Sequence, residues 1–284
     1  MTDWLLGAVD QYGWDQVRPW VKSIRASGFT GRVTLLIYRG DATEMQRQCN
    51  TYDIEVLHAF ADSWSQPISH TARMRDTQSH QMRFFHFWCL LNANNIGKYE
   101  HVILTDVRDV IFQSDPSAWL ASGPLEHEDI VAPSEGLLYR DEPWGADNLQ
   151  RGFGPLVWQF MQDQPIANVG TIAGLAGPIR DLCLTLYLMG ENRYIPNDQS
   201  GFNVLIRTML ARMTEFVRMG WGWAAQCGTM LDPQKVPTFY TKWLELPPLI
   251  EDGMVLTPSK TPFALVHQWD RVPELKNAVE ARYA

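Results

Sequence analysis

The chain has 284 residues, of which 45% are hydrophobic and 20% charged; this balance excludes an intrinsically disordered chain and suits one large α/β domain or two smaller ones. The formal net charge of −8 argues against a general nucleic-acid-binding protein, which carries a basic face, but not against a nucleotide whose phosphates a metal ion neutralises. The four cysteines form no CxxC pair, so we predict reduced thiols rather than a zinc site or a disulfide framework.

Strands and helices alternate through the first part of the chain. Continuous apolar runs predict buried strands, and the segments between them have the apolar spacing of helices. The expected strands are 4–9, 31–40, 54–60 and 101–106, and the expected helices are 14–28, 41–53 and 80–94. Strands separated by helices of about a dozen residues indicate an α/β fold with a central, mainly parallel sheet flanked by helices.

The second part of the chain is less regular. Its expected elements are a short strand within 126–136, a loop at 137–155, a strand at 166–177, helices at 178–192 and 198–210, and a strand, turn and helix in 263–284. The loop is rich in glycine, proline and charge, which suits either a lid between Leu137 and Gly154 that closes over a substrate or an ordinary surface loop. No repeat or linker divides the chain, so we predict a single domain.

An acidic turn follows the strand expected at 101–106. The stretch HVILTDVRDVIF passes from an apolar run into Asp106-Val-Arg-Asp109 and directly into a second apolar run. Carboxylates at the end of a buried strand cost free energy unless they are paired or bind a cation. Asp106 and Asp109 are therefore candidate ligands of Mg²⁺ or Mn²⁺, with Arg108 pairing with a carboxylate or a phosphate. The alternative is a structural turn in which Asp106 caps a helix and Arg108 pairs with Asp109.

The stretch YEHVILTDVRDVIFQSDP resembles the metal-binding segment of the GT-A glycosyltransferases, which use nucleotide-diphosphate sugars, and TDVRDVxFQxDP also resembles a bacterial group of glycosyltransferase-like proteins. Glycogenin-type and galactosyltransferase-type members show a helix with Arg or Lys, an acidic DxD, Asn-x-Gly, Asp-Gln and a late His. The residues that match this order are Arg83, Asp106, Asn168, Gly170, Asp198, Gln199 and His267. The resemblance implies one GT-A domain over 1–284, with a nucleotide-binding part to about residue 120 and an acceptor- and metal-completing part from about residue 121.

The resemblance also implies a divalent metal, Mn²⁺ or Mg²⁺, held by Asp106, Asp109 and His267. The family pattern is Asp-x-Asp, whereas here the second acidic residue comes one position later and Arg108 stands in its place. Either Asp109 serves through a shift of one residue, or Asp106 and His267 alone bind the metal. For His267, which follows the apolar run FALV, the alternative is a structural histidine at a strand end.

Four residues are candidates for contacts with the donor nucleotide. Asp10 and Tyr12, in AVDQYGW, match the first loop, where an Asp and a Tyr contact the base; the alternative is a strand-to-helix turn. Arg83 is expected to contact a phosphate or the sugar, and Arg108 is expected to pair with a carboxylate or a phosphate. For Arg83 the alternative is a surface charge on an amphipathic helix.

The last candidates concern the sugars. Asn168 and Gly170 are expected to hold the donor sugar, the glycine allowing close backbone approach, or to form a tight turn. Asp198, with Gln199 beside it, suits the stabilisation of positive charge at the anomeric carbon, and it equally suits a helix N-cap. An inverting enzyme also needs a general base for the acceptor hydroxyl; Glu135, in APSEG, and Asp198 are both candidates.

Together these features predict a metal-dependent glycosyltransferase of glycan biosynthesis, which transfers a sugar from a nucleotide-diphosphate sugar to a glycan or lipid-linked acceptor. The motif order favours retention of configuration. One alternative is a non-catalytic sugar-nucleotide- or glycan-binding protein with the same fold. The other is a phosphate-ester hydrolase with a nucleophilic Asp106 or Asp109, which would need a late lysine beside an acidic pair; Glu251-Asp252 has no convincing lysine nearby.

The sequence also bears on the compartment. The N-terminal stretch MTDWLLGAVDQYGWD has no basic segment before its short apolar run, unlike a signal peptide. No apolar run reaches the length of a membrane span. We therefore predict a cytoplasmic protein that touches a membrane at most peripherally.

Overall fold

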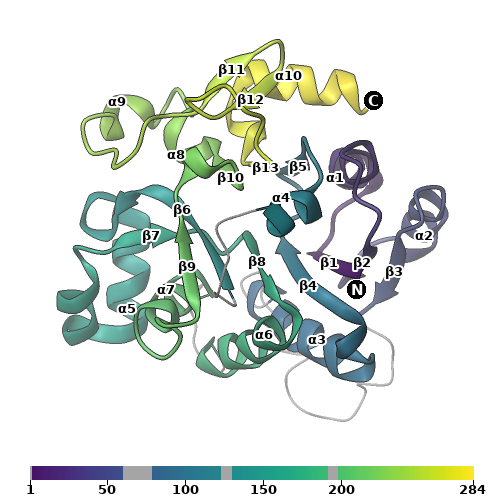
Figure 1. Cartoon of the computed structure of the whole chain (residues 1–284), viewed down its shortest axis with the longest axis horizontal. Coiled ribbons are helices and arrows are strands. Elements are labelled where there is room, and N and C mark those ends of the chain that lie inside the picture. Colours follow the sequence, from purple (N-terminus) through teal and green to yellow (C-terminus); the bar gives the residue numbers. More distant parts are fainter. Residues whose placement is uncertain (1, 60–78, 123–129, 191–197) are drawn as a thin grey trace.

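The first four strands of the main sheet run parallel, as predicted. The computed structural model describes residues 2–59, 79–122, 130–190 and 198–284. The four strands, in the sheet order β3-β2-β1-β4, are β1 (Thr2–Val9), β2 (Arg32–Ile37), β3 (Glu55–His58) and β4 (Tyr99–Thr105). The helical segments among them are α1 (Trp14–Ala26), α2 (Ala42–Asn50), α3 (Ser79–Ala93) and the short η3 (Ile96–Lys98) (Figure 1).

Both faces of this parallel part are buried. Along β1, Leu5 belongs to the hydrophobic cluster that contains α1 residues such as Trp20. Trp4 and Leu6 belong to the cluster on the other face, with α3 residues such as Phe84. A strand buried on both faces needs apolar side chains at successive positions, which is why β1 reads as a continuous apolar run.

Beyond β4 the main sheet is mixed rather than mainly parallel. β8 (Thr171–Leu175) pairs antiparallel with β4, and β6 (Ile130–Leu138) pairs antiparallel with β8 and with β7 (Pro165–Ala167). β9 (Thr214–Val217) pairs parallel with β6. The alternation of strand and helix that signals parallel pairing ends at β4. The single strand expected at 166–177 is two strands, β7 and β8, and helices α6 (Ala176–Gly190) and α7 (Asp198–Arg207) follow.

A smaller sheet, at the top of Figure 1, carries the C-terminal part of the chain. Its order is β10-β13-β5, with β13 antiparallel to β5 and parallel to β10. The strands are β5 (Val110–Phe112), β10 (Ala224–Gln226) and β13 (Leu265–His267), with the hairpin β11 (Leu249–Glu251) and β12 (Met254–Leu256) nearby. The remaining elements are α4 (Pro116–Ser122), η4 (Tyr139–Asp141), η5 (Met219–Trp221), α8 (Cys227–Met230), α9 (Val236–Phe239), η6 (Trp269–Arg271) and α10 (Pro273–Arg282).

The prediction of a loop at 137–155 is wrong. Most of this segment is helical: after η4, helix α5 (Pro143–Met161) begins with proline at its first position. The Glu142 side chain caps the helix by accepting hydrogen bonds from the backbone N–H groups of Trp144 and Gly145, which satisfies donors that have no partner inside a helix. Gly154, with a φ of 80°, kinks the helix. The lid hypothesis, which rested on an irregular loop, loses its basis.

Candidate metal centre and its two cavities

The acidic turn lies at the seam between the two sheets. Asp106 follows β4, and its backbone N–H donates to the carbonyl of Gly170, at 2.8 Å. A Cβ at position 170 would lie 2.6 Å from Asp106 Oδ2, so only glycine permits this approach. β5 follows the turn, and its antiparallel pairing with β13 sets His267 opposite Val110. The strand pairing therefore brings His267 to the turn from a distant part of the sequence.

Asp106, Asp109 and His267 form a group that could hold a metal ion. One ligand atom from each residue lies within 4.8 Å of the others. His267 Nε2 lies 3.6 Å from Asp106 Oδ2 and 3.7 Å from Asp109 Oδ1. These gaps are longer than hydrogen bonds, and two carboxylates with one imidazole suit Mn²⁺ or Mg²⁺ in ligand chemistry. Asp109 thus lies with the other two despite the shift of one residue.

His267 is oriented by Gln226, a residue that the sequence analysis missed. The His267 side chain is buried, and its Nδ1 lies 2.7 Å from Gln226 Oε1. The amide nitrogen of Gln226 donates to Thr171 Oγ1, at 3.3 Å, which leaves the amide oxygen to accept a hydrogen bond from Nδ1–H. Nε2 therefore faces the carboxylates and is available as a ligand. A glutamine inside the apolar run WAAQC was the available signal.

The charges of the three groups are strongly coupled. Burial raises the pKa of Asp106, but Arg83 and His267 outweigh it and hold that pKa well below its usual range. Burial also raises the pKa of Asp109, and the nearby carboxylate of Asp106 adds to this effect. Burial lowers the pKa of His267, yet the two carboxylates raise it above its usual value overall. Two carboxylates around one imidazole favour the binding of a cation, either a proton or a metal.

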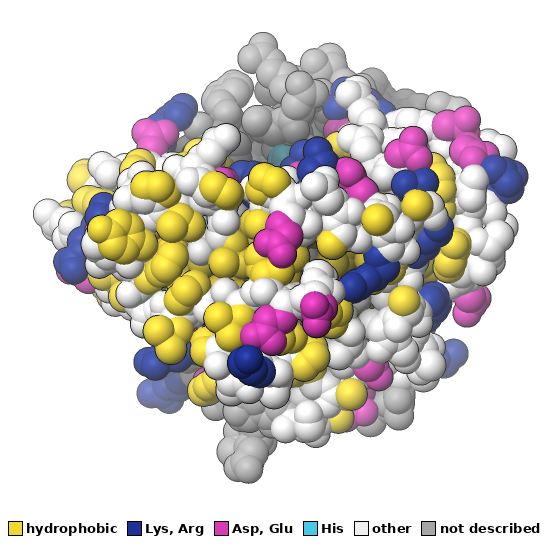
Figure 2. Space-filling view, turned by 90° about the horizontal axis from the view of Figure 1, so that it is seen from above, with side chains coloured by type: hydrophobic (Ala, Val, Ile, Leu, Met, Phe, Trp, Pro, Cys, Tyr) yellow, Lys and Arg dark blue, Asp and Glu magenta, His cyan; other side chains and the backbone are white. Residues whose placement is uncertain are grey.

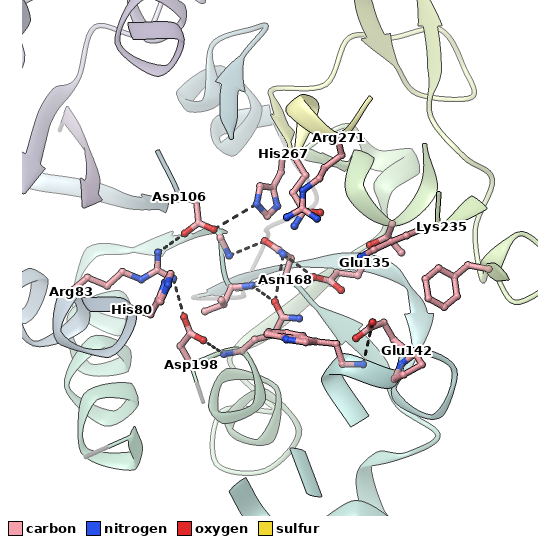
Figure 3. A pocket seen from close by; sticks show the side chains of 18 residues that line it. His80, Arg83, Asp106, Glu135, Glu142, Asn168, Asp198, Lys235, His267 and Arg271 are labelled. Carbon is pink, nitrogen blue, oxygen red and sulfur yellow. Dashed lines mark hydrogen bonds and ion pairs between the residues drawn. The ribbon is translucent and has the colours of Figure 1, made fainter. Parts of the chain in front are cut away.

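Arg83 connects the turn to α7. Its side chain is buried, at 6% exposure, which excludes the alternative of a surface charge. One Nη donates to Asp106, and the other donates to Asp198 Oδ2, at 3.2 Å (Figure 3). Asp106 therefore accepts from Arg83 instead of capping a helix. Asp198 is the first residue of α7, and its other oxygen accepts from the Gln199 N–H, at 2.9 Å.

Arg108 stays close to carboxylates. Its Nη2 lies 3.3 Å from Asp270 and 3.5 Å from Asp109. The ion pair between Arg108 and Asp109, which the structural alternative predicted, is therefore present alongside the grouping of Asp109 with His267. Arg108 also lines one of the two cavities described next, so its charge is accessible from that cavity.

Two cavities meet at this turn. The first has a volume of about 720 Å³ and the second about 540 Å³. They share the lining residues His80, Arg83, Asp106, Trp144, Gln268 and Arg271. In Figure 2, histidine atoms are visible in a hollow of the surface, with basic and acidic side chains beside it. A ligand that passes from one cavity to the other would cross Asp106.

The second cavity lies at the carboxyl ends of β1 and β2. Asp10 and Tyr12 line it, as does Arg39. Asp10 accepts two hydrogen bonds from Arg39, each 2.7 Å long, so its carboxylate is held in a fixed orientation. This edge is where ligands of open α/β sheets bind.

The first cavity brings together the residues expected around the sugars. Asn168 Nδ2 donates to Glu135 Oε1, at 2.8 Å, and Asn168 Oδ1 accepts from the Gly170 N–H, at 2.8 Å. Gln199 Oε1 lies 3.5 Å from Asn168 Nδ2. Glu135 is buried, and burial raises its pKa. Trp144, Lys235 and Arg271 also line this cavity, and the sequence analysis named none of them, because isolated aromatic and basic residues carry no local signal.

No family model matches the chain, and no curated protein sequence matches it. Among the residues that the structure describes, no helix is long and apolar enough to cross a membrane.

Proposed function

We propose that the chain is a metal-dependent glycosyltransferase that moves a sugar from a nucleotide-diphosphate sugar to an acceptor hydroxyl. The observation that carries the proposal is the position of Asp106, which belongs to the group that could hold a metal ion and lines both cavities. A diphosphate is the part of such a donor that joins its nucleoside to its sugar. The proposal assigns the nucleoside to the second cavity and both sugars to the first.

Asp106, Asp109 and His267 would hold the metal, Mn²⁺ or Mg²⁺. Once bound, such an ion would neutralise the charge that develops on the leaving nucleoside diphosphate. Gln226 keeps Nε2 of His267 turned toward the carboxylates. Arg83 fixes Asp106 from the other side, so the first carboxylate is oriented before any ligand binds.

Three residues of the first cavity are assigned roles in the transfer of the sugar. Arg83 donates to Asp198 Oδ2 and holds this carboxylate in place, which suits the stabilisation of positive charge at the anomeric carbon. Glu135 forms no ion pair with a described residue, and its raised pKa suits a proton acceptor. Asn168 holds Glu135 in place.

Retention is proposed on the motif order, and inversion is the second candidate because Glu135 suits a general base. The anomeric configuration of the product, read by NMR, separates the two outcomes. The hydrolase alternative gains no support, since Glu251 and Asp252 line neither cavity.

The test is a screen of nucleotide-diphosphate sugars with and without Mn²⁺, with release of the nucleoside diphosphate as the readout. We expect metal-dependent release from donors of one base, and its loss in Asp106→Asn. Release that is unchanged without metal or in this variant would contradict the proposal. Metal-dependent binding without any release would favour the non-catalytic binding protein.

A further inference from the structure

One cation of the first cavity has no carboxylate partner among the described residues. Three basic residues line it: Arg83, Lys235 and Arg271. Arg83 bridges two carboxylates, and Arg271 lies 3.8 Å from Asp270 and also lines the second cavity. Lys235, half-buried ahead of α9, forms no ion pair or hydrogen bond through its ammonium group with any residue in the described ranges. Its charge is therefore left for a ligand.

The carboxylates of the same cavity do not need Lys235. Glu142 accepts from two backbone N–H groups at the start of α5, at 3.4 and 2.5 Å. Glu135 accepts from Asn168, at 2.8 Å. Each is satisfied by a neutral donor, and neither lies within ion-pair distance of Lys235. Figure 3 shows Lys235 and Glu142 on the side of the cavity opposite Arg83 and His80.

Two aromatic side chains line the same cavity as Lys235. Trp144 is 56% exposed and lines the cavity from the start of α5, while Phe239 lines it from α9 and is buried. An exposed aromatic face suits the apolar C–H face of a sugar ring, since it buries area without requiring a polar partner. A cation in the same cavity as such a face suits a sugar that also carries a negative charge.

We propose that the Lys235 end of the first cavity is an acceptor subsite for an anionic sugar, one that bears a carboxylate or a phosphate. Lys235 binds the anion and Trp144 packs against the sugar ring. The acceptor role in this inference rests on the proposed glycosyl transfer, whereas the binding of an anion by Lys235 does not depend on it. Because the chain has a net charge of −8, its overall field repels anions, and the preference must come from this local cation.

The test uses three probes: methyl glucoside, methyl glucuronide and glucose 6-phosphate. Each is titrated by calorimetry into the full chain with Mn²⁺, with and without a nucleoside diphosphate. We expect at least one anionic probe to bind about tenfold or more tightly than the neutral one. The probe that binds tightest tells a carboxylate site from a phosphate site.

Two lysine variants decide the assignment. In Lys235→Gln the preference for the anionic probe should disappear. In Lys242→Gln it should remain, because Lys242 pairs with Asp141, at 3.8 Å, and does not line the cavity. Equal binding of neutral and anionic probes to the wild type, or a preference that survives in Lys235→Gln, would overturn the anion site.

The acceptor role is separable from the glycosyltransferase proposal. If Lys235→Gln weakens the binding of the nucleoside diphosphate instead, Lys235 belongs to the donor site and the acceptor subsite is wrong. If no nucleoside diphosphate binds the wild type, the proposed function fails, while the titrations without nucleotide still measure the anion preference of Lys235.

Discussion

The parallel and the mixed parts of the main sheet contribute to the site in different ways. In the parallel part, β1 and β4 end at one edge, so Asp10 and Asp106 reach the cavities through local sequence alone. In the mixed part and the smaller sheet, Asn168 and His267 arrive through antiparallel pairing with distant segments. A short motif thus places one half of the site, and long-range pairing places the other half.

Arg83 joins Asp106 of the parallel part to Asp198 of α7. Its replacement is therefore expected to have the largest effect on the contact between the two parts. Removal of one partner from a buried ionic group leaves unpaired charge in the interior. For Arg83→Met we expect a loss of about 3–5 kcal/mol in the free energy of unfolding, measured by urea titration.

The matched control is Arg47→Met, which removes an exposed ion pair with Glu44 on α2. We expect little change in stability there, since exposed pairs are well solvated. A loss in Arg83→Met no larger than in this control would mean that Arg83 does not hold the two parts together.

The pH dependence of stability tests whether the parallel part holds a buried histidine in its neutral form. His86, on α3, is hydrogen-bonded through Nδ1 to the hydroxyl of Tyr38, on the loop after β2, at 2.8 Å, and burial lowers the pKa of His86 from 6.5 to about 4. A depressed histidine pKa means that the unfolded chain binds the proton first, so stability is full above pH 6.5 and falls as the pH drops toward 4. At about 1.4 kcal/mol per pH unit, the loss is about 3 kcal/mol.

Urea titrations of the wild type and His86→Gln between pH 7 and 4 check this expectation. The carboxylates contribute equally to the pH dependence of stability in both proteins, so the difference between the two curves reports on His86. The wild type should lose more stability than the variant over this window. Parallel curves for the two proteins would show that His86 is not held neutral by the fold.

A substitution at Gly170 tests the close contact between Asp106, at the end of β4, and the turn before β8. In Gly170→Ala the new Cβ would lie 2.6 Å from Asp106 Oδ2, so the carboxylate or the backbone must shift. We expect a loss of about 1–3 kcal/mol in stability together with weaker Mn²⁺ binding. Gly177→Ala is the control, since its Cβ would meet nothing within 4 Å; equal effects in both variants would contradict the close approach.

The sequence predicts the parallel part well because apolar spacing records local structure. Residues 4–9 and 101–106 were expected as strands and form most of β1 and β4. Helix α5 was missed because PWGADNLQRGFGP has the composition of a loop. The helix is stabilised by the capping carboxylate of Glu142 and by the burial of Leu149 in a hydrophobic cluster. This burial depends on tertiary contacts that composition does not record.

The candidate site divides in the same way. The acidic turn is readable because carboxylates end a buried strand, but the grouping of Asp109 with His267 depends on the pairing of β5 with β13. Gln226 and Lys235 lie in segments without a motif. Their positions follow only from the fold.

The two halves of the site are expected to supply one metal centre. Calorimetric titration with Mn²⁺ tests it on the wild type, Asp106→Asn and His267→Gln, with thermal midpoints confirming that each variant is folded. We predict that the wild type binds Mn²⁺ and that each variant loses at least about 100-fold in affinity, beyond the loss usual for a residue that only orients a ligand. Wild-type affinity in either variant would contradict the account.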